Sequence, residues 1–497
     1  MIYCIKSVFP THYFFRRKSG CRSHIGEADC FFSEARQEYQ TLKEKITKSE
    51  LFFVASMLFG LFFGAGNLIF PIYMGQLAGS RMIPAVIGFL ITGVGLPLLG
   101  VTAMGISRSD GLIELSGKVG RGYSVFFTCA LYLTIGPFFA IPRCATVPFT
   151  VGIEPILGEG VNTSLALVIF SVLFFAAVMA FSLFPGKILT WVGKIINPLF
   201  LIFLGILVVA ALIKPIGAIS DTAPVGAYAD KAFATGFLEG YNTMDALASL
   251  AFGIIVINVI RGLGVKEPRA VAKNTIRAGV FSCLIMAAIY VAVTVVGAQC
   301  RGLSELCKNG GEVFAVVADH YFGKAGAIIL AVTVTFACLK TAVGLVTSCS
   351  ETFVELFPKL FSYRVWAIIF SLCSFLIANL GLNAIISYSL PVLMFLYPLA
   401  ITLILLGLFG NLFGHSKYVY RFVTGFTLIA AIFDFLGALP KQVIAALRLE
   451  GVLKLVNTVL PFSEYGLGWI IPAALGLLVG LVARLIWEKP AVSGGQQ

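Results

Sequence analysis

Long runs of apolar residues alternate with short polar loops along most of the chain. A helix needs about 20 apolar residues to cross the roughly 30 Å hydrocarbon core of a bilayer, and runs of that order recur after residue 50. We expect membrane-spanning helices at residues 51–74, 82–105, 123–151, 163–184, 188–213, 237–259, 276–298, 325–357, 365–380, 384–412, 422–439 and 467–487. The pattern therefore predicts an all-α polytopic membrane protein with about twelve transmembrane helices.

The composition excludes the soluble classes of protein. Charged residues make up 12% of the chain and hydrophobic residues 59%, whereas about 25% of an ordinary globular chain is charged. So few charges cannot cover this much apolar surface in water, which excludes a soluble enzyme, a secreted disulfide scaffold and a disordered protein. The net charge of +12 then indicates basic cytoplasmic loops and no nucleic-acid partner.

Lysine and arginine are concentrated in alternate loops, and this asymmetry predicts the orientation. With the N-terminus inside, the basic residues of the inner loops are Arg108, Lys118, Arg121, Lys187, Arg261, Lys266, Arg269, Lys273, Lys359, Arg364, Lys417 and Arg421. The outer loops are mostly poorer in such residues, although Lys441, Arg448 and Lys454 run against the rule near the C-terminus. We therefore expect a multi-pass membrane protein with both termini in the cytoplasm.

The spans group into a transporter domain at residues 51–488, preceded by an extension at 1–50 and followed by a tail at 489–497. In the extension, charges follow a short apolar patch, which reverses the order in a signal peptide, so we expect a disordered or interfacial segment. Within the domain we expect a first repeat of five spans at 51–213, a second at 237–412, and two accessory helices at 422–487.

Cysteine and histidine add little. Cys300 and Cys307 share a loop, so a disulfide between them is possible if the loop faces an oxidising compartment. The four histidines lie far apart in terminal or loop segments, without the spacing of a metal site, so we expect no cofactor.

Two spans are interrupted by small and polar residues. The first span contains Gly64, Gly66 and Asn67, and the sixth contains Asp245 with Ser249 and Gly253. Glycines alone would permit close helix packing, but polar groups at membrane depth favour a binding site. Interrupted helices at matching positions of two five-helix halves are typical of a transporter site at the membrane midplane.

Broken helices expose backbone amides at one half-helix and carbonyls at the other, which suits a zwitterion. We expect the amides of Gly64, Ala65 and Gly66 to bind a carboxylate. The ammonium group would then lie on carbonyls near Phe62, Ala248 and Ser249. Apolar walls around such a site would suit an aliphatic side chain, so the pattern predicts an amino acid as the substrate.

Several separate motifs resemble the branched-chain amino acid:cation symporter family. They are LFFGAGNLIFP at 61–71, TIGPFFAIPR at 134–143, TMD at 243–245 running into Phe252–Gly253, and ACLKTAVGL at 337–345. The resemblance covers roughly residues 50–488. It implies the inverted-repeat fold of the leucine transporter, a place in the bacterial cytoplasmic membrane, and import of leucine, isoleucine and valine, usually with sodium.

The resemblance also implies a sodium site between the first and eighth spans. By motif matching, its residues are Gly60, Phe63, Ala337, Lys340 and Thr341. Oxygen ligands suit a hard cation, but the resemblance leads us to expect threonine at position 340, where this chain has lysine.

Two interpretations of Lys340 stay open. Its amine can pair with a carbonyl or carboxylate for packing, or the ammonium can occupy the sodium position and replace the ion. The second predicts sodium-independent uptake, either proton-coupled or by exchange, so the coupling ion is Na+ or H+.

Other polar and aromatic positions are weaker candidates. Asp245 either balances a cation in the site or bonds to neighbouring backbone, and we favour neither. Tyr132, Ser249 and Phe252 are candidate pocket residues, although such side chains more often face lipid or the core. For Arg143, near the outer end of the third span, we favour a side chain that reaches the membrane interface over one that gates the outer vestibule.

These patterns favour a secondary carrier for branched-chain amino acids that works by alternating access, with the substrate and the lipid bilayer as its partners. The alternative is a proton-coupled carrier or exchanger of another small neutral amino acid in the same fold. An enzyme is disfavoured, because the sequence contains no nucleophile elbow, phosphate-binding loop or zinc-protease motif. A channel would show uncoupled flux, and a sensor would contain a signalling domain. The oligomeric state and the preference among the three amino acids stay open.

Overall fold

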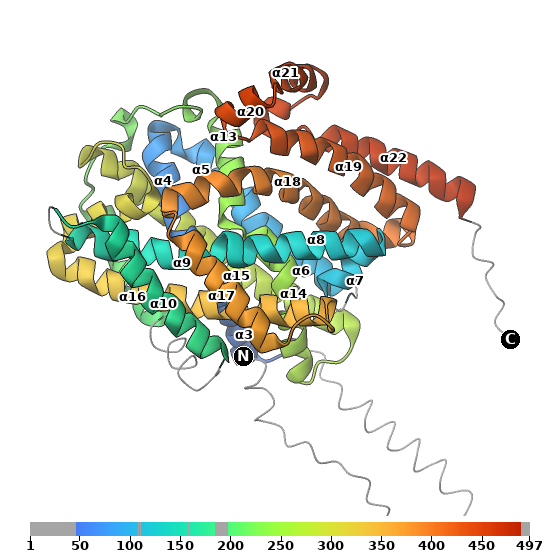
Figure 1. Cartoon of the computed structure of the whole chain (residues 1–497), viewed down its shortest axis with the longest axis horizontal. Coiled ribbons are helices and arrows are strands. Elements are labelled where there is room, and N and C mark those ends of the chain that lie inside the picture. Colours follow the sequence, from blue (N-terminus) through green and yellow to red (C-terminus); the bar gives the residue numbers. More distant parts are fainter. Residues whose placement is uncertain (1–45, 108, 110, 158–159, 184–196, 489–497) are drawn as a thin grey trace, which may run out of the picture.

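The computed structural model describes residues 46–107, 109, 111–157, 160–183 and 197–488. Most of the expected extension, the tail at 489–497, Arg108 and Lys187 lie outside these residues. Over the described ranges the chain forms helices and no strand (Figure 1). Eight of these helices are long and apolar enough to cross a membrane, or nine if one bent pair counts as a span. A multi-pass membrane protein is thus confirmed, and the total of about twelve spans stays a prediction.

The first span is broken where the glycines predict it. Helix α3 (Lys48–Phe62) begins with a capping box in which the Thr47 hydroxyl accepts from the Glu50 amide. It ends because Phe63 and Gly64 are extended, and α4 (Ala65–Ala78) then restarts the span. The interruption predicted at Gly64–Gly66 is therefore confirmed, and it lies at the N-terminal edge of that segment.

The next spans are continuous or kinked. The second span is α5 (Met82–Leu90), a π-helical turn and α6 (Leu96–Ile106). The third is α8 (Arg121–Leu133), a π-helical turn at Thr134–Phe138 and α9 (Ala140–Pro148), with non-helical backbone at Gly136. Helices α10 (Thr163–Leu183) and α12 (Asn197–Ile213) follow; the start of the span expected at 188–213 lies outside the described residues.

The sixth span breaks earlier than expected. Helix α13 (Tyr228–Glu239) tightens into a 3-10 turn, η8 (Gly240–Thr243), and Met244 adopts a left-handed conformation before α14 (Asp245–Gly262) begins. Ser249 lies inside α14, so the expected break there is wrong. Gly253 also packs closely against α6, because a Cβ at this position would lie 2.7 Å from Met104 Cγ. The helix bends by 40° just after it.

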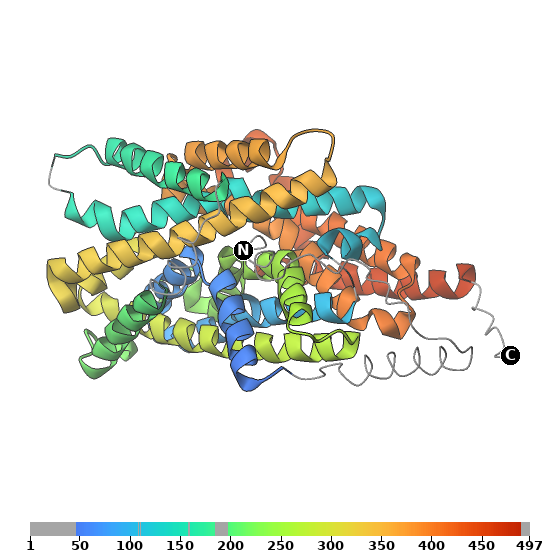
Figure 2. The same cartoon turned by 90° about the horizontal axis from the view of Figure 1, so that it is seen from below.

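The second half of the chain contains longer helices. They are α15 (Pro268–Gln299), α16 (Gly310–Leu356), α17 (Tyr363–Ala378), α18 (Leu382–Phe409), α19 (Lys417–Gly437), α20 (Lys441–Ala446), α21 (Glu450–Val459) and α22 (Ile470–Trp487). Helix α16 runs obliquely across the molecule and kinks at Gly323, whose φ is 59° (Figure 2). The outer segment around Glu312 and Asp319, expected as a loop, is thus the first part of α16. The outer loop expected after α19 contains α20 and α21, while α19 and α22 lie side by side (Figure 1).

Close backbone contact at glycines joins the broken spans to their neighbours. At the crossing of α4 and α15, a Cβ on Gly75 would collide with the Thr294 carbonyl, and one on Gly297 with the Ile72 carbonyl. The crossing of α5 and α13 is built in the same way by Gly88 and Gly236. Because α6 also packs against α14 and α15, helices α3 to α6 and α13 to α15 form one group, which we call the bundle.

A second group of helices packs around α16. It contains α9, α10 and α17, and we call it the scaffold. Its contacts include Gly152, next to α9, where a Cβ would collide with Ala331 of α16. Helix α16 also contacts α4, so the scaffold meets the bundle at the first broken span. In the loop before α16, Cys300 and Cys307 are free thiols, so the disulfide left open by the sequence is not formed.

The crossing of α4 and α15 gives a test of packing. We expect Gly75→Ala to destabilise the protein by about 1 to 3 kcal/mol, because the added methyl group forces two backbones apart. A fluorescence-detected melting curve in detergent should then shift to lower temperature. The matched control is Gly425→Ala on α19, where a Cβ meets open space and alanine favours the helix. Equal melting temperatures for the two variants would contradict the tight crossing.

Candidate functional site

A buried polar cluster joins the two broken spans. Asn67 lies in the first turn of α4, Asp245 begins α14, and Tyr290 projects from α15. The Asp245 carboxylate accepts from Asn67 Nδ2 at 2.6 Å and from Tyr290 Oη at 2.9 Å, and Asn67 also donates to Tyr290. All three side chains are at most 2% exposed. The polar residues predicted from the two interruptions, Asn67 and Asp245, therefore lie in direct contact.

Both half-helices start at this cluster, so their positive ends converge there. The Gly64 amide donates to Asn67 Oδ1 at 2.8 Å, and this bond caps α4. The amides of Ala65 and Gly66 follow in the first turn, where no carbonyl within the helix can accept from them. Of the three amides expected to bind a carboxylate, Gly64 is thus already engaged, and Ala65 and Gly66 keep the geometry of an anion site.

The expected carbonyl site on the sixth span needs correction. Ala248 and Ser249 lie inside α14, where backbone carbonyls accept hydrogen bonds from the following turn. The Ser249 hydroxyl donates to the Ala246 carbonyl at 2.6 Å and packs against Gly100 of α6. The carbonyls freed by the actual break belong to η8. The Asn242 carbonyl oxygen lies 3.5 Å from the point that a Cβ at Gly66 would occupy. Among the predicted carbonyls, that of Phe62 remains beside the first break.

Two of the expected pocket residues come together. Tyr132 on α8 and Phe252 on α14 are both buried, and the Tyr132 hydroxyl donates to the carbonyl of Ala251, next to Phe252. Both aromatic side chains lie along α14, more than one helical turn beyond Asp245. They contribute apolar packing, and the backbone contact joins the third span to the sixth.

The expected cation-site residues come from α3 and α16. Gly60 and Phe63 lie at the end of α3. The Thr341 methyl group of α16 lies 3.4 Å from the point that a Cβ at Gly64 would occupy. The Thr341 hydroxyl donates to the Ala337 carbonyl at 3.2 Å, within α16. The eighth span therefore meets the first break at Thr341, and the cation site between these spans stays a prediction.

Lys340 is the neighbour of Thr341 and is partly buried. Across the part of the chain that the structure describes, its amine makes no hydrogen bond or ion pair. Both interpretations of Lys340 need oxygen partners for the amine, and neither has one among these residues, which include the expected cation-site residues. Asp245, a possible charge partner, accepts from Asn67 and Tyr290 and makes no ion pair with Lys340.

Arg143 differs from our expectation. Its side chain is 2% exposed, so the favoured interpretation, that it reaches the membrane interface, is wrong. One guanidinium nitrogen donates to the Asn242 carbonyl at 2.8 Å, another donates to the Ser389 hydroxyl, and the group lies over the Phe70 ring at 5.1 Å. Tyr290, Asn242 and Ser389 were not among the predicted site residues, although each places a polar group inside or beside an apolar run.

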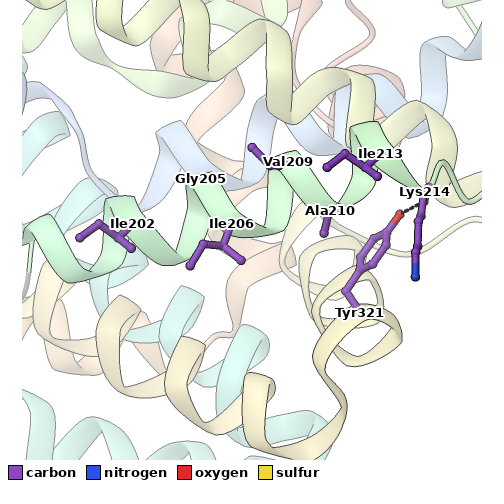
Figure 3. Close-up of a pocket in the computed structure, with 8 residues that line it drawn as sticks. All are labelled: Ile202, Gly205, Ile206, Val209, Ala210, Ile213, Lys214 and Tyr321. Carbon is purple, nitrogen blue, oxygen red and sulfur yellow. Dashed lines mark hydrogen bonds between the residues drawn. The ribbon is translucent and has the colours of Figure 1, made fainter.

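An apolar groove on the outside of α12 lies apart from this cluster (Figure 3). Ile206 and Val209 line it and are each 52% exposed, and Tyr321 donates to the Lys214 carbonyl at 2.6 Å at one end. None of its lining residues belongs to a broken span. Exposed apolar side chains on a membrane helix face lipid, so the groove is not a substrate site.

Known proteins with similar sequences share one description. A family model described as branched-chain amino acid transport protein matches residues 47–486. A branched-chain amino acid permease BrnQ from Lactobacillus delbrueckii subsp. lactis is 52% identical over 450 residues, covering 90% of this chain and 100% of the relative. A permease of the same name from Bacillus subtilis is 42% identical over 448 residues, covering 90% of this chain and all of that one.

Solved structures show a similar fold at low sequence identity. The inward-facing structure of Mhp1 has a TM-score of 0.59 and 15% identity, covering 88% of this chain and 90% of that one. A Na+-coupled sialic acid symporter has a TM-score of 0.52 and 15% identity, covering 94% and 98% of the two chains. These similarities show that the chain shares the fold of these two transporters.

Proposed function

The chain belongs to the family of branched-chain amino acid transport proteins, and from this membership we propose that it imports leucine, isoleucine and valine by alternating access. The observation that supports the mechanism is the convergence of two broken helices on Asn67, Asp245 and Tyr290. Its place would be the bacterial cytoplasmic membrane, with both termini inside. Such a buried polar cluster in an apolar bundle is the usual mark of a substrate pathway.

We infer that the first ten spans form an inverted repeat of residues 51–213 and 237–412. Two glycine crossings support this inference. In one, the second half of the first span (α4) crosses α15, which belongs to the second span of the second half. In the other, the second half of the sixth span (α14) crosses α6, which belongs to the second span of the first half, with close contacts at Gly253 and Gly100. A pseudo-two-fold axis in the membrane plane produces such matched pairs. Helices α19 and α22 would then be the accessory helices of 422–487.

In the proposed binding mode, the substrate lies between the two breaks. Its carboxylate accepts from the amides of Ala65 and Gly66, and its ammonium group lies between the Phe62 carbonyl and the Asp245 carboxylate. A buried carboxylate is costly without an opposite charge, and Asn67 and Tyr290 supply only neutral donors to Asp245. The aliphatic side chain then packs against apolar surface, to which Tyr132 and Phe252 contribute.

The coupling ion follows from Lys340. We propose that its ammonium group takes the place of sodium beside Gly60, Phe63, Ala337 and Thr341. The assignment rests on the motif match at position 340, because the amine makes no hydrogen bond to these described residues and its side chain would have to rotate to reach their oxygen atoms. Transport would then be coupled to protons or would proceed by exchange.

Purified protein in liposomes tests the substrate class. Uptake of labelled leucine should be abolished by excess unlabelled isoleucine or valine, because one aliphatic pocket accepts all three. Excess alanine, proline or glutamate should leave it nearly unchanged. Full competition by alanine or proline, with little by valine, would contradict the proposal and favour a carrier for another small neutral amino acid.

A further inference from the structure

The Arg143 side chain contacts three elements besides its own helix. Its guanidinium binds Asn242 at the break of the sixth span, Ser389 on α18 and the face of the Phe70 ring on α4. An arginine this deeply buried in a membrane protein is costly, so its contacts must compensate for lost hydration. The substrate binding mode proposed above makes no use of it.

These contacts cross the boundary between bundle and scaffold. Arg143 belongs to α9 of the scaffold, whereas Phe70 and Asn242 belong to the two broken spans of the bundle. Both lie in the halves of these spans that face outward when the termini are inside. One guanidinium thus joins the outer half of each broken span to a helix of the other group.

The contact with the sixth span has a favourable electrostatic basis. The Asn242 carbonyl is one of those left free where α13 and η8 end, and the C-terminal end of a helix attracts a cation. Glu239, about one turn earlier, is close enough to attract the Arg143 guanidinium. The planar guanidinium can reach Asn242 and Ser389 together, which a lysine ammonium cannot do with the same geometry.

We propose that Arg143 is a positioning residue that holds the carrier closed on its outer side. The inference rests on the proposed alternating access, in which the bundle rocks against the scaffold. When the outer halves of α4 and α13 move away from α9, the contacts with Phe70 and Asn242 must break. Arg143 therefore sets the balance between outward-open and outward-closed states, and the substrate does not touch it.

A distance measurement tests the closure directly. Spin labels on Asp230→Cys in α13 and Thr163→Cys in α10, both exposed positions, report the separation of bundle and scaffold in a cysteine-depleted protein in nanodiscs. Arg143→Gln should shift the distance distribution towards longer separations. Ser389→Ala should shift it less, and Arg143→Lys should restore part of the short population. Arg81→Gln, an exposed arginine between α4 and α5, is the control and should leave it unchanged.

Transport kinetics in liposomes complete the test. Arg143→Gln should lower the maximal rate of leucine uptake by about tenfold, with KM changed by less than about threefold, because closure and not binding is impaired. An unchanged distance distribution would overturn the proposal, as would a large rise in KM at an unchanged maximal rate, which would make Arg143 a substrate ligand. If the unsubstituted protein transports no leucine, the proposed substrate fails, whereas the distance shift still decides the role of Arg143.

Discussion

Asp245→Asn is expected to lower leucine uptake about 100-fold or more. The carboxylate accepts two hydrogen bonds, from Asn67 and Tyr290, and would balance the substrate ammonium. Both bonds end on the same oxygen, Oδ2, and asparagine keeps one oxygen that can accept them, so the substitution mainly removes the negative charge. Removing one partner of a buried charge pair costs about 3 to 5 kcal/mol, which exceeds the roughly 2.7 kcal/mol that corresponds to 100-fold in rate.

Initial rates of labelled leucine uptake into liposomes measure this effect. Tyr290→Phe should reduce uptake by about tenfold, because it removes one donor and keeps the ring packed. The control is Asp319→Asn, an exposed aspartate in the outer part of α16, which should transport at the unsubstituted rate. Uptake by Asp245→Asn within about threefold of the control would show that the carboxylate does not take part in transport.

The break in the first span could be predicted from the sequence, because the cause of the break is local. Gly64 and Gly66 weaken the helix whatever surrounds them, and Asn67 can cap the restarted half from within the same turn. Local propensity and tertiary packing agree at this position. For that reason the first span is broken within two residues of the predicted glycines.

The sixth span shows where such reasoning fails. Ser249 looks like an interruption, yet it lies inside α14 and packs against Gly100 of α6. Gly253 both packs beside Met104 and directly precedes a 40° bend of α14. The actual break uses Gly240, which crosses closely beside Thr92, and a left-handed Met244 that no sequence pattern marks. A glycine at a helix crossing and a glycine at a break are identical in sequence, and only the neighbouring helix distinguishes them.

The site residues show the same contrast between features fixed within one helix and features fixed by packing between helices. Asn67 and Asp245 stand out because a polar group inside an apolar run is rare. Tyr290 does not, since a tyrosine is amphipathic and is equally at home at a membrane interface. Arg143 was expected at that interface because of its position near a helix end, and its burial depends on carbonyl and hydroxyl partners from α18 and η8 that lie far away in sequence. The chemistry of the site was predictable where it lies on one helix, and not where two helices share it.

Lys340→Thr is expected to make transport depend on sodium. The threonine would restore a hydroxyl beside Thr341 and remove the ammonium group that we place in the cation site, leaving oxygen atoms that suit a hard cation. Leucine uptake into liposomes should then be about tenfold faster with sodium outside than with choline, in the range of ordinary coupling free energies between two sites. The unsubstituted protein should give equal rates in the two media.

The matched control for this result is Lys359→Thr, an exposed lysine just after the inner end of α16, which should transport at equal rates in sodium and choline. Both variants lose one lysine charge, one within α16 and one just after it, so the comparison shows whether the position of the lost charge matters. Collapse of uptake by the unsubstituted protein when choline replaces sodium would contradict the assignment. The carrier would then bind sodium despite Lys340, and the amine would have to lie away from Gly60 and Phe63.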